Sequence, residues 1–159
     1  MIQSKNIALV AHDNRKQDLI EWAEWNYFVL IQHNLICTGT TGKLVEQAIL
    51  GKVKKLNPEV EVLHNMHKLK SGPLGGDQQL GAMITENNVD LLIFFWDPLA
   101  AQPHDTDVKA LLRIAVLYNI PSACNRATAD FLISSPLLNS EYQKKETDFT
   151  SYVTRFDKK

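Results

Sequence analysis

Residues 90–98 read Asp90-Leu91-Leu92-Ile93-Phe94-Phe95-Trp96-Asp97-Pro98. Apolar side chains fill consecutive positions here, which is typical of a strand that is covered on both of its faces. Parallel sheets between two layers of helices give their strands this environment. The run stops at Asp97-Pro98, because proline has no N–H for a strand ladder and a lone carboxylate is costly to bury. The stretch therefore predicts a central strand of a parallel sheet.

Segments of the same kind recur along the chain and alternate with helical patterns. Further short strands are predicted at 7–11 and 35–37, at 60–66 or just after it, and at 120–124. Apolar residues at helical spacing predict helices over 16–33, 43–50, 77–87, 108–119 and 129–133, and a terminal helix carrying Phe149, Tyr152, Val153 and Phe156. This alternation predicts an α/β protein. We expect one domain over residues 1–159, a three-layer α/β/α sandwich with a mainly parallel five-stranded sheet, Rossmann- or flavodoxin-like.

Composition excludes several classes of function. The 17 basic and 18 acidic residues leave a net charge of −1, which argues against a surface for nucleic acid or another polyanion. No apolar run approaches the roughly 20 residues of a membrane span, and the N-terminus lacks a signal pattern. We therefore expect a cytoplasmic protein with no membrane partner. Cys37 and Cys124 lie in short apolar segments, where free thiols are expected rather than a disulfide or a metal pair.

Polar motifs follow the predicted strands at their carboxyl ends. They lie at residues 12–13, 38–42, 71–77, 97–107 and 125–126. In open α/β sheets, ligands bind beyond the carboxyl ends of the strands. We therefore expect these motifs to line one site along a single edge of the sheet.

Two of the motifs have the character of an anion site. Thr38-Gly39-Thr40-Thr41-Gly42 stands at a strand-to-helix turn, where free N–H groups and hydroxyls suit a phosphate. Ser71-Gly72 offers similar groups, and Lys16 lies one turn beyond His12. An ordinary helix cap would explain the threonines equally well. Neither a GxxxxGK[ST] loop nor a GxGxxG after the first strand is present, so nucleoside triphosphatase and dinucleotide sites are disfavoured.

Carboxylates and imidazoles on the same edge point to proton transfer. They are Asp13, Asp77, Asp97, Asp107, His12 and His104. Their spacing matches no metal-ligand motif, so no metal is expected. One carboxylate as general base and one imidazole as hydrogen-bond donor could remove a proton next to the carbonyl of a small phosphorylated sugar or ketone. Asp77 could instead cap the helix that follows it, and His104 could be an ordinary surface histidine. A regulatory module that binds such a ligand without turnover is the alternative function.

These motifs, in this order, resemble the methylglyoxal synthase family. The resemblance rests on Ala11-His12-Asp13 with Lys16, on residues 38–42, on Ser71-Gly72-Pro73-Leu74-Gly75-Gly76-Asp77-Gln78-Gln79, on Phe94-Phe95-Trp96-Asp97-Pro98, and on residues 103–111. It spans residues 5–136. It implies conversion of dihydroxyacetone phosphate to methylglyoxal and inorganic phosphate, without metal or organic cofactor. Related modules of large amidotransferase-linked synthetases bind effectors and do not catalyse, which keeps the regulatory alternative open.

The resemblance also implies a role for each motif residue. Asp77 would be the base, and His104, oriented by Asp107, would hydrogen-bond the substrate oxygens and move protons between them. Asp97 would lie close to the reacting carbons. The residues implied in substrate and phosphate binding are His12, Asp13, Lys16, Thr38, Gly39, Thr40, Thr41, Ser71, Gly72 and His104. The family forms homohexamers that phosphate inhibits. Residues 52–66 are longer than the family pattern and are expected to form a surface insertion beside the third strand.

Overall fold

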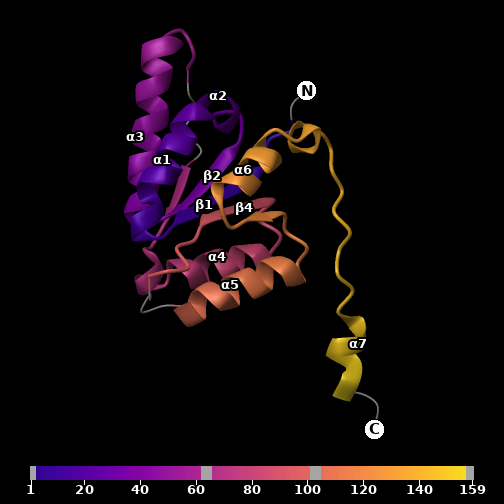
Figure 1. Ribbon diagram of the computed structural model, residues 1–159. Helices are drawn as coiled ribbons and strands as arrows, with labels where there is room; N and C mark the ends of the chain where they lie inside the picture. Colours follow the sequence, from indigo (N-terminus) through magenta and orange to yellow (C-terminus); the bar gives the residue numbers. More distant parts are fainter. Residues whose placement is uncertain (1–2, 62–65, 101–104, 157–159) are drawn as a thin grey trace.

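A parallel sheet organises the chain in the computed structural model, which describes residues 3–61, 66–100 and 105–156 (Figure 1). The described residues form a five-stranded sheet in the order β3-β2-β1-β4-β5, and each pairing is parallel. The strands are β1 Asn6–Ala11, β2 Asn34–Thr38, β3 Met66–Leu69, β4 Leu91–Phe95 and β5 Ser122–Ala123. The sequence predicted a Rossmann-like or a flavodoxin-like sheet, and the observed strand order is the Rossmann-like one.

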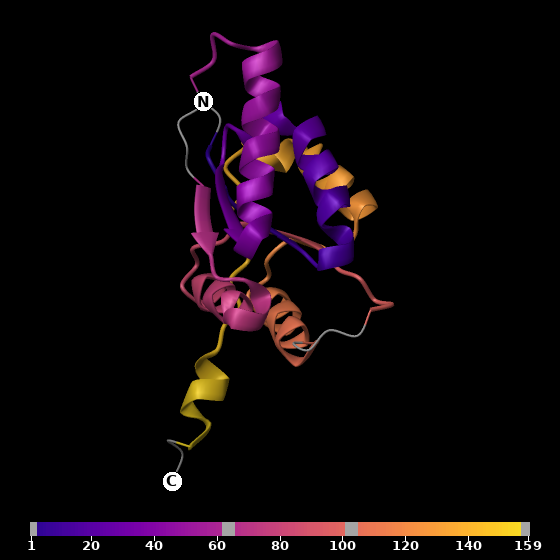
Figure 2. The same ribbon diagram turned by 90° about the vertical axis from the view of Figure 1, so that its left-hand side faces the viewer.

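Helices cover both faces of the sheet. The α-helices are α1 Lys16–Trp25, α2 Tyr27–Leu30, α3 Gly39–Leu56, α4 Gly76–Thr85, α5 Asp105–Leu117, α6 Arg126–Ile133 and α7 Thr150–Val153. Short 3-10 turns are η1 Asp13–Arg15, η2 Gly72–Leu74, η3 Pro136–Asn139 and η4 Thr154–Phe156. Helices α1, α3 and α6 lie on one face, and α4 and α5 lie on the other (Figures 1 and 2). The predicted three-layer architecture is confirmed.

Each face of the sheet has its own apolar core. Every residue of β4 is buried, and alternate side chains along it enter opposite cores. Ile93 packs with Trp22 and Val45 beneath α1 and α3, whereas Phe94 packs with Leu80 beneath α4. Burial of both faces explains why the strand shows no alternation between apolar and polar residues.

Two of the differences between the observed and the predicted helix boundaries have a clear physical reason. The predicted helix over 16–33 divides at Asn26, whose side chain donates to the Trp22 carbonyl oxygen at 2.9 Å and competes with the helical hydrogen bonds. The predicted helix over 43–50 extends over all of α3. Its buried residues Val45, Ile49 and Val53 recur every four positions. The first residues of the predicted surface insertion at 52–66 therefore belong to this helix. The third strand is β3, which begins at Met66, the last residue of the predicted stretch 60–66, and residues 62–65 lie outside the described ranges.

The C-terminal segment leaves the layers after η3 and runs past the end of α5 without regular structure (Figure 1). Thr147 Oγ1 donates to the Leu117 carbonyl oxygen at 2.7 Å, and the rings of Phe149 and Tyr118 are 5.3 Å apart. The predicted terminal helix is only the short α7. No helix within the described ranges combines the length and the apolar character that crossing a bilayer requires.

Candidate functional site

A cavity of about 310 Å³ opens at the carboxyl edge of the sheet, where the sequence predicted a site. Its walls come from the loops after β1, β2 and β3 and from the first turn of α4. The lining residues are Val10, Ala11, His12, Asp13, Lys16, Thr38, Gly39, Thr40, Thr41, Ser71, Gly72, Pro73, Asp77 and Phe94. The parallel strands thus bring together motifs that lie far apart in the sequence.

The loops around this cavity meet at the backbone of Lys70 and Ser71. The carbonyl oxygen of Lys70 accepts the N–H of Gly39 at 3.1 Å, which joins the end of β3 to the start of α3. The N–H of Lys70 donates to Oε1 of Gln79 at 2.8 Å, and the carbonyl oxygen of Ser71 accepts the N–H of Gly76 at 2.9 Å. These bonds join the same point to α4. The role of Gln79 was not predicted, because its partner is a backbone group nine positions away.

Two glycines make this close approach possible. Gly39 has φ of +50°, and a Cβ there would lie 2.9 Å from Cα of Ser71. A Cβ on Gly76 would lie 2.0 Å from the carbonyl oxygen of Lys70. Any side chain at either position would push the loops apart. Glycine at these positions therefore sets the width of the cavity.

The threonine motif forms the start of a helix, four residues earlier than predicted. Thr38 is the N-cap of α3, and Thr40 and Thr41 lie in the first turn. Helix N–H groups at this end have no partner within the helix, and the helix dipole is positive here. Thr38 and Thr41 are buried in the cavity wall. The arrangement suits a phosphate better than a simple cap, because the N-cap side chain makes no capping hydrogen bond.

Lys16 supplies a positive charge beside the threonine motif. Its Nζ donates to Oγ1 of Thr40 at 3.1 Å and lies 2.6 Å from Oδ1 of Asp13. The Lys16 side chain is about one quarter exposed, whereas the Asp13 side chain is largely exposed. A phosphate entering the cavity would therefore meet a lysine that is already held in place.

Asp77 lies in the first turn of α4, in the cavity wall, and is only 4% exposed. Asp77 does not occupy the N-cap position that the alternative interpretation gave it. Gly75 is the N-cap of α4, and its φ of +99° suits glycine. A carboxylate in this first turn still interacts favourably with the helix dipole. Its burial in one cavity wall with the threonine motif suits a proton acceptor.

His12 follows β1 directly and is held from three sides. Its backbone N–H donates to the Phe95 carbonyl oxygen at 3.2 Å, and its ring packs edge-on against Phe94 with centroids 5.1 Å apart. Nδ1 accepts the backbone N–H of Asp97 at 3.1 Å. A ring nitrogen that accepts a hydrogen bond carries no proton, so the neutral ring is protonated at Nε2. His12 is thus prepared as an N–H donor in the cavity wall.

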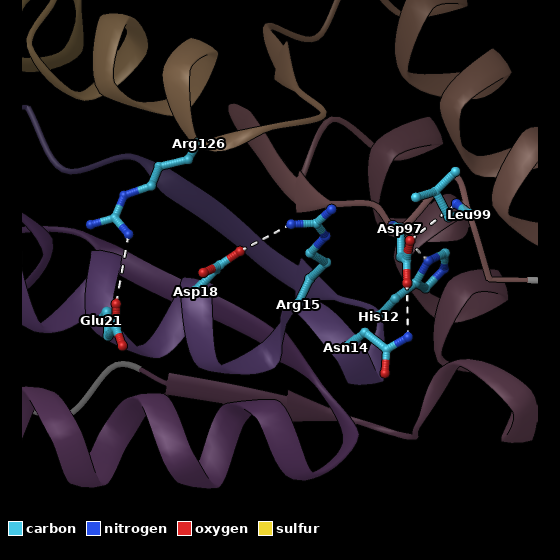
Figure 3. A network of polar contacts seen from close by, with 8 residues as sticks. All are labelled: His12, Asn14, Arg15, Asp18, Glu21, Asp97, Leu99 and Arg126. Atoms are coloured by element: carbon cyan, nitrogen blue, oxygen red, sulfur yellow. Dashed lines mark hydrogen bonds and ion pairs between the residues drawn. The ribbon is translucent and has the colours of Figure 1, made fainter.

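Asp97 lies behind His12 rather than in the cavity wall (Figure 3). Oδ2 accepts Nδ2 of Asn14 at 2.9 Å, and Oδ1 accepts the N–H of Leu99 at 3.0 Å. The hydrogen bond from Asn14, and next that from Leu99, lower the pKa of Asp97. The sequence did not single out Asn14, although it stands in the polar triplet that ends the first strand.

Asp97, Asp107 and the predicted motif at 125–126 are not among the described lining residues of the cavity. Asp107 is half-buried in the first turn of α5. His104 lies outside the described ranges, one residue before α5 begins.

Other chemistries find little support among the described residues. Burial raises the pKa of the Cys37 thiol to about 12, so it stays protonated, and burial also raises the pKa of Cys124. Both cysteines are free. Within the described ranges, no group of three or more His, Cys, Asp or Glu side chains could hold a metal ion.

A larger hollow of about 560 Å³ lies near Lys5, Asp90 and Pro121, at the opposite edge of the sheet from the motifs.

Known proteins share both the fold and the sequence. Residues 18–124 match the family model described as the MGS-like domain. The methylglyoxal synthase of Maridesulfovibrio salexigens is 59% identical over 98% of this chain and 99% of its own length. That of Leptospira interrogans is 55% identical over 95% of this chain and 93% of its own. A crystal structure of methylglyoxal synthase from Elizabethkingia anophelis has a TM-score of 0.80 and 50% identity, covering 96% of this chain and 91% of that one.

The chain is thus an MGS-like domain by fold and by sequence. Since its similarity to enzymes extends over nearly the whole length of both chains, it belongs to the methylglyoxal synthase family. This membership favours a lyase over the regulatory alternative.

Replacing Gly39 with alanine should weaken binding of inorganic phosphate by about tenfold or more. The reason is strain of roughly 1–3 kcal/mol at its positive φ, together with the contact with Ser71. Titration calorimetry with phosphate would measure the loss. Gly51→Ala is the matched control, because it lies in the same helix with nothing within 4 Å of its Cβ position. Equal phosphate affinity in the two variants would contradict the inferred width constraint.

Proposed function

We propose that this protein is a carbon–oxygen lyase that converts dihydroxyacetone phosphate to methylglyoxal and inorganic phosphate. The single observation that carries the proposal is the burial of Asp77 beside the threonine-rich start of α3 in one cavity. An anion site next to a carboxylate suits a small phosphorylated ketone. Family membership narrows this chemistry to one reaction.

In the proposed mechanism, the phosphate group binds at the start of α3. The donors are the backbone N–H groups of the first turn, the hydroxyls of Thr38, Thr40 and Thr41, and the Ser71-Gly72 turn. Lys16 supplies a balancing charge, and Asp13 holds Lys16 in place. Inorganic phosphate fits the same donors, which supports inhibition by the product.

The proton is removed by Asp77. Its carboxylate takes a proton from the hydroxymethyl carbon, and the electron pair moves to the carbonyl oxygen to form an enediolate. The hydrogen bonds that this oxygen receives become stronger as its charge grows. The Nε2–H group of His12 is one suitable donor, supported by the contact of Nδ1 with Asp97. His104, oriented by Asp107, is proposed to move protons between the substrate oxygens.

Phosphate leaves in the second step. The terminal hydroxyl gives up its proton and becomes the aldehyde carbonyl. The C=C electron pair of the enediolate shifts to form the next carbon–carbon double bond, and the carbon–oxygen bond to phosphate breaks with its electrons on the phosphate. The enol of methylglyoxal remains and takes up a proton at carbon to give the dicarbonyl. The family resemblance implies a position for Asp97 close to the reacting carbons, but Asp97 lies behind His12 and outside the described cavity wall. We therefore propose that Asp97 acts through His12, in its ionised form. No step requires a metal or an organic cofactor.

The proposed reaction is tested by incubating the protein with dihydroxyacetone phosphate and measuring phosphate and methylglyoxal together. Both products should appear in equal amounts, because each turnover releases one of each. EDTA should not change the rate, since no step uses a metal ion. Tight binding of the substrate with neither product formed would instead support a regulatory module.

Asp77→Asn should reduce kcat by about 10²–10⁴-fold, the usual contribution of a general base. Phosphate affinity should remain close to that of the unchanged protein, because the amide has the same shape. Asp18→Asn is the control, because this half-exposed side chain only pairs with Arg15 on the surface. Activity that survives in Asp77→Asn would assign Asp77 a structural role.

We also propose that the protein is a homo-oligomer, a homohexamer by its family. Support comes from large apolar side chains that a single copy leaves in water, such as Trp25 at 82% and Phe131 at 80% exposure. Light scattering coupled to gel filtration should give about six times the chain mass of 18.0 kDa. A mass of one chain at micromolar concentration would contradict this proposal.

A further inference from the structure

One side chain links the two loops that carry His12 and Asp97. Asn14 lies in η1, after β1, and Asp97 follows β4, the strand beside β1. Nδ2 of Asn14 lies 2.9 Å from Oδ2 of Asp97, across 83 positions of sequence (Figure 3). Asn14 itself is exposed, whereas Asp97 is only 6% exposed.

The chemistry of the two groups fixes how they meet. An ionised carboxylate only accepts hydrogen bonds, so the amide must present its NH₂ group to Asp97. The second carboxylate oxygen accepts the N–H of Leu99 at 3.0 Å. Donors thus act on both oxygens, which fixes the rotation of the carboxylate. The hydrogen bond from Asn14 is also the largest cause that lowers the pKa of Asp97.

The backbone of Asp97 transmits this order to the cavity. Its N–H donates to Nδ1 of His12 at 3.1 Å, and His12 lines the cavity. This contact keeps the proton of the neutral imidazole on Nε2. If Asp97 moved away, Nδ1 would lose its donor, and the ring could take either tautomer.

We propose that Asn14 is a positioning residue: by holding the Asp97 carboxylate it keeps the Asp97 N–H on His12, so that the imidazole offers Nε2–H to the substrate. The structural part concerns the free protein. Only its kinetic consequence rests on the proposed function.

The charged neighbours of this link provide a matched control. Arg15, in the same turn, also lowers the pKa of Asp97, but by charge alone and to a smaller extent. Its Nη1 pairs with Asp18 at 3.3 Å. The remaining charges of the turn, Lys16 and Asp13, pair with each other. Arg15→Ala therefore removes a charge near Asp97 and leaves the hydrogen bond from Asn14 intact.

The structural part is tested by NMR on the free protein, with ¹⁵N shifts of the His12 ring and ¹³C shifts of the Asp97 carboxyl. In Asn14→Ala, Asp97 should titrate at higher pH than in the unchanged protein. The His12 ring, where neutral, should lose its uniform Nε2–H signature. Arg15→Ala should keep the signature of His12. A His12 tautomer that stays the same in Asn14→Ala would overturn the proposal.

The kinetic part uses the same variants with dihydroxyacetone phosphate. Asn14→Ala should lower kcat by about tenfold or more, the order of loss seen when a hydrogen-bond partner that orients a metal-ligating histidine is removed. KM should change less than kcat, because most of the proposed phosphate donors lie at the start of α3 and in the Ser71-Gly72 turn, away from Asn14. Arg15→Ala should keep a kcat close to that of the unchanged protein. An equal loss of kcat in both variants would overturn the proposal, since the effect would then belong to the turn as a whole.

Asn14→Asp distinguishes a positioning role from a structural one by its pH dependence. At neutral pH it places two carboxylates in contact, which removes the donor. At lower pH the pair shares a proton, and an O–H···O bond replaces the lost N–H···O bond. Its kcat relative to that of the unchanged protein should therefore rise as pH falls, whereas the ratio for Asn14→Ala should stay level. Level ratios for both would overturn the proposal.

The two proposals fail in different ways. An unchanged protein that releases no phosphate from dihydroxyacetone phosphate removes the proposed function, while the NMR result still decides the role of Asn14. An unchanged protein that is active, with Asn14→Ala equally active and the His12 signature intact, removes only the positioning role.

Discussion

The peptide between Lys70 and Ser71 is the point on which the site depends. The Lys70 carbonyl oxygen accepts the N–H of Gly39, the first residue of α3, and the Ser71 carbonyl oxygen accepts the N–H of Gly76, the first residue of α4. Two helix N-termini from opposite faces of the sheet are thereby held against the end of the edge strand β3. One terminus presents the threonine hydroxyls, and the other presents Asp77. The distance between the threonine motif and the Asp77 carboxylate is thus set by backbone contacts rather than by flexible side chains.

The sheet and the location of the site could be predicted because few physical rules decide them. A run such as Leu91–Phe95 must be covered on both faces, and this requires helices on both sides of a parallel sheet. Parallel strands then bring their carboxyl ends to one edge, which gathers the polar motifs without knowledge of the strand order. The burial of Thr38, Thr41 and Asp77 in one cavity follows from this rule.

The side-chain hydrogen bonds around the site could not be predicted. They join positions that are distant in sequence, and the residue types involved could form such bonds with many other partners. Nothing in the sequence indicates that Asn14 meets Asp97, or that Gln79 accepts a backbone N–H. The exact start of α4 also could not be predicted from the sequence: the helix begins at Gly76, one residue before the predicted start. Aspartate is a common N-cap, but the positive φ of Gly75 moves the cap two positions earlier. Local backbone geometry of this kind is decided by tertiary packing.

The lack of space at Gly76 also limits how the site can change. Because a Cβ would meet the Lys70 carbonyl oxygen at 2.0 Å, every codon change that alters this residue adds an atom where none fits. Substitutions at Gly76 therefore cannot produce small, graded changes in activity. Two positions earlier, Leu74 is 72% exposed and can vary with little effect on packing. A mutant library aimed at new substrates would keep Gly76 constant and diversify exposed positions such as Leu74, where an added or lost atom faces solvent.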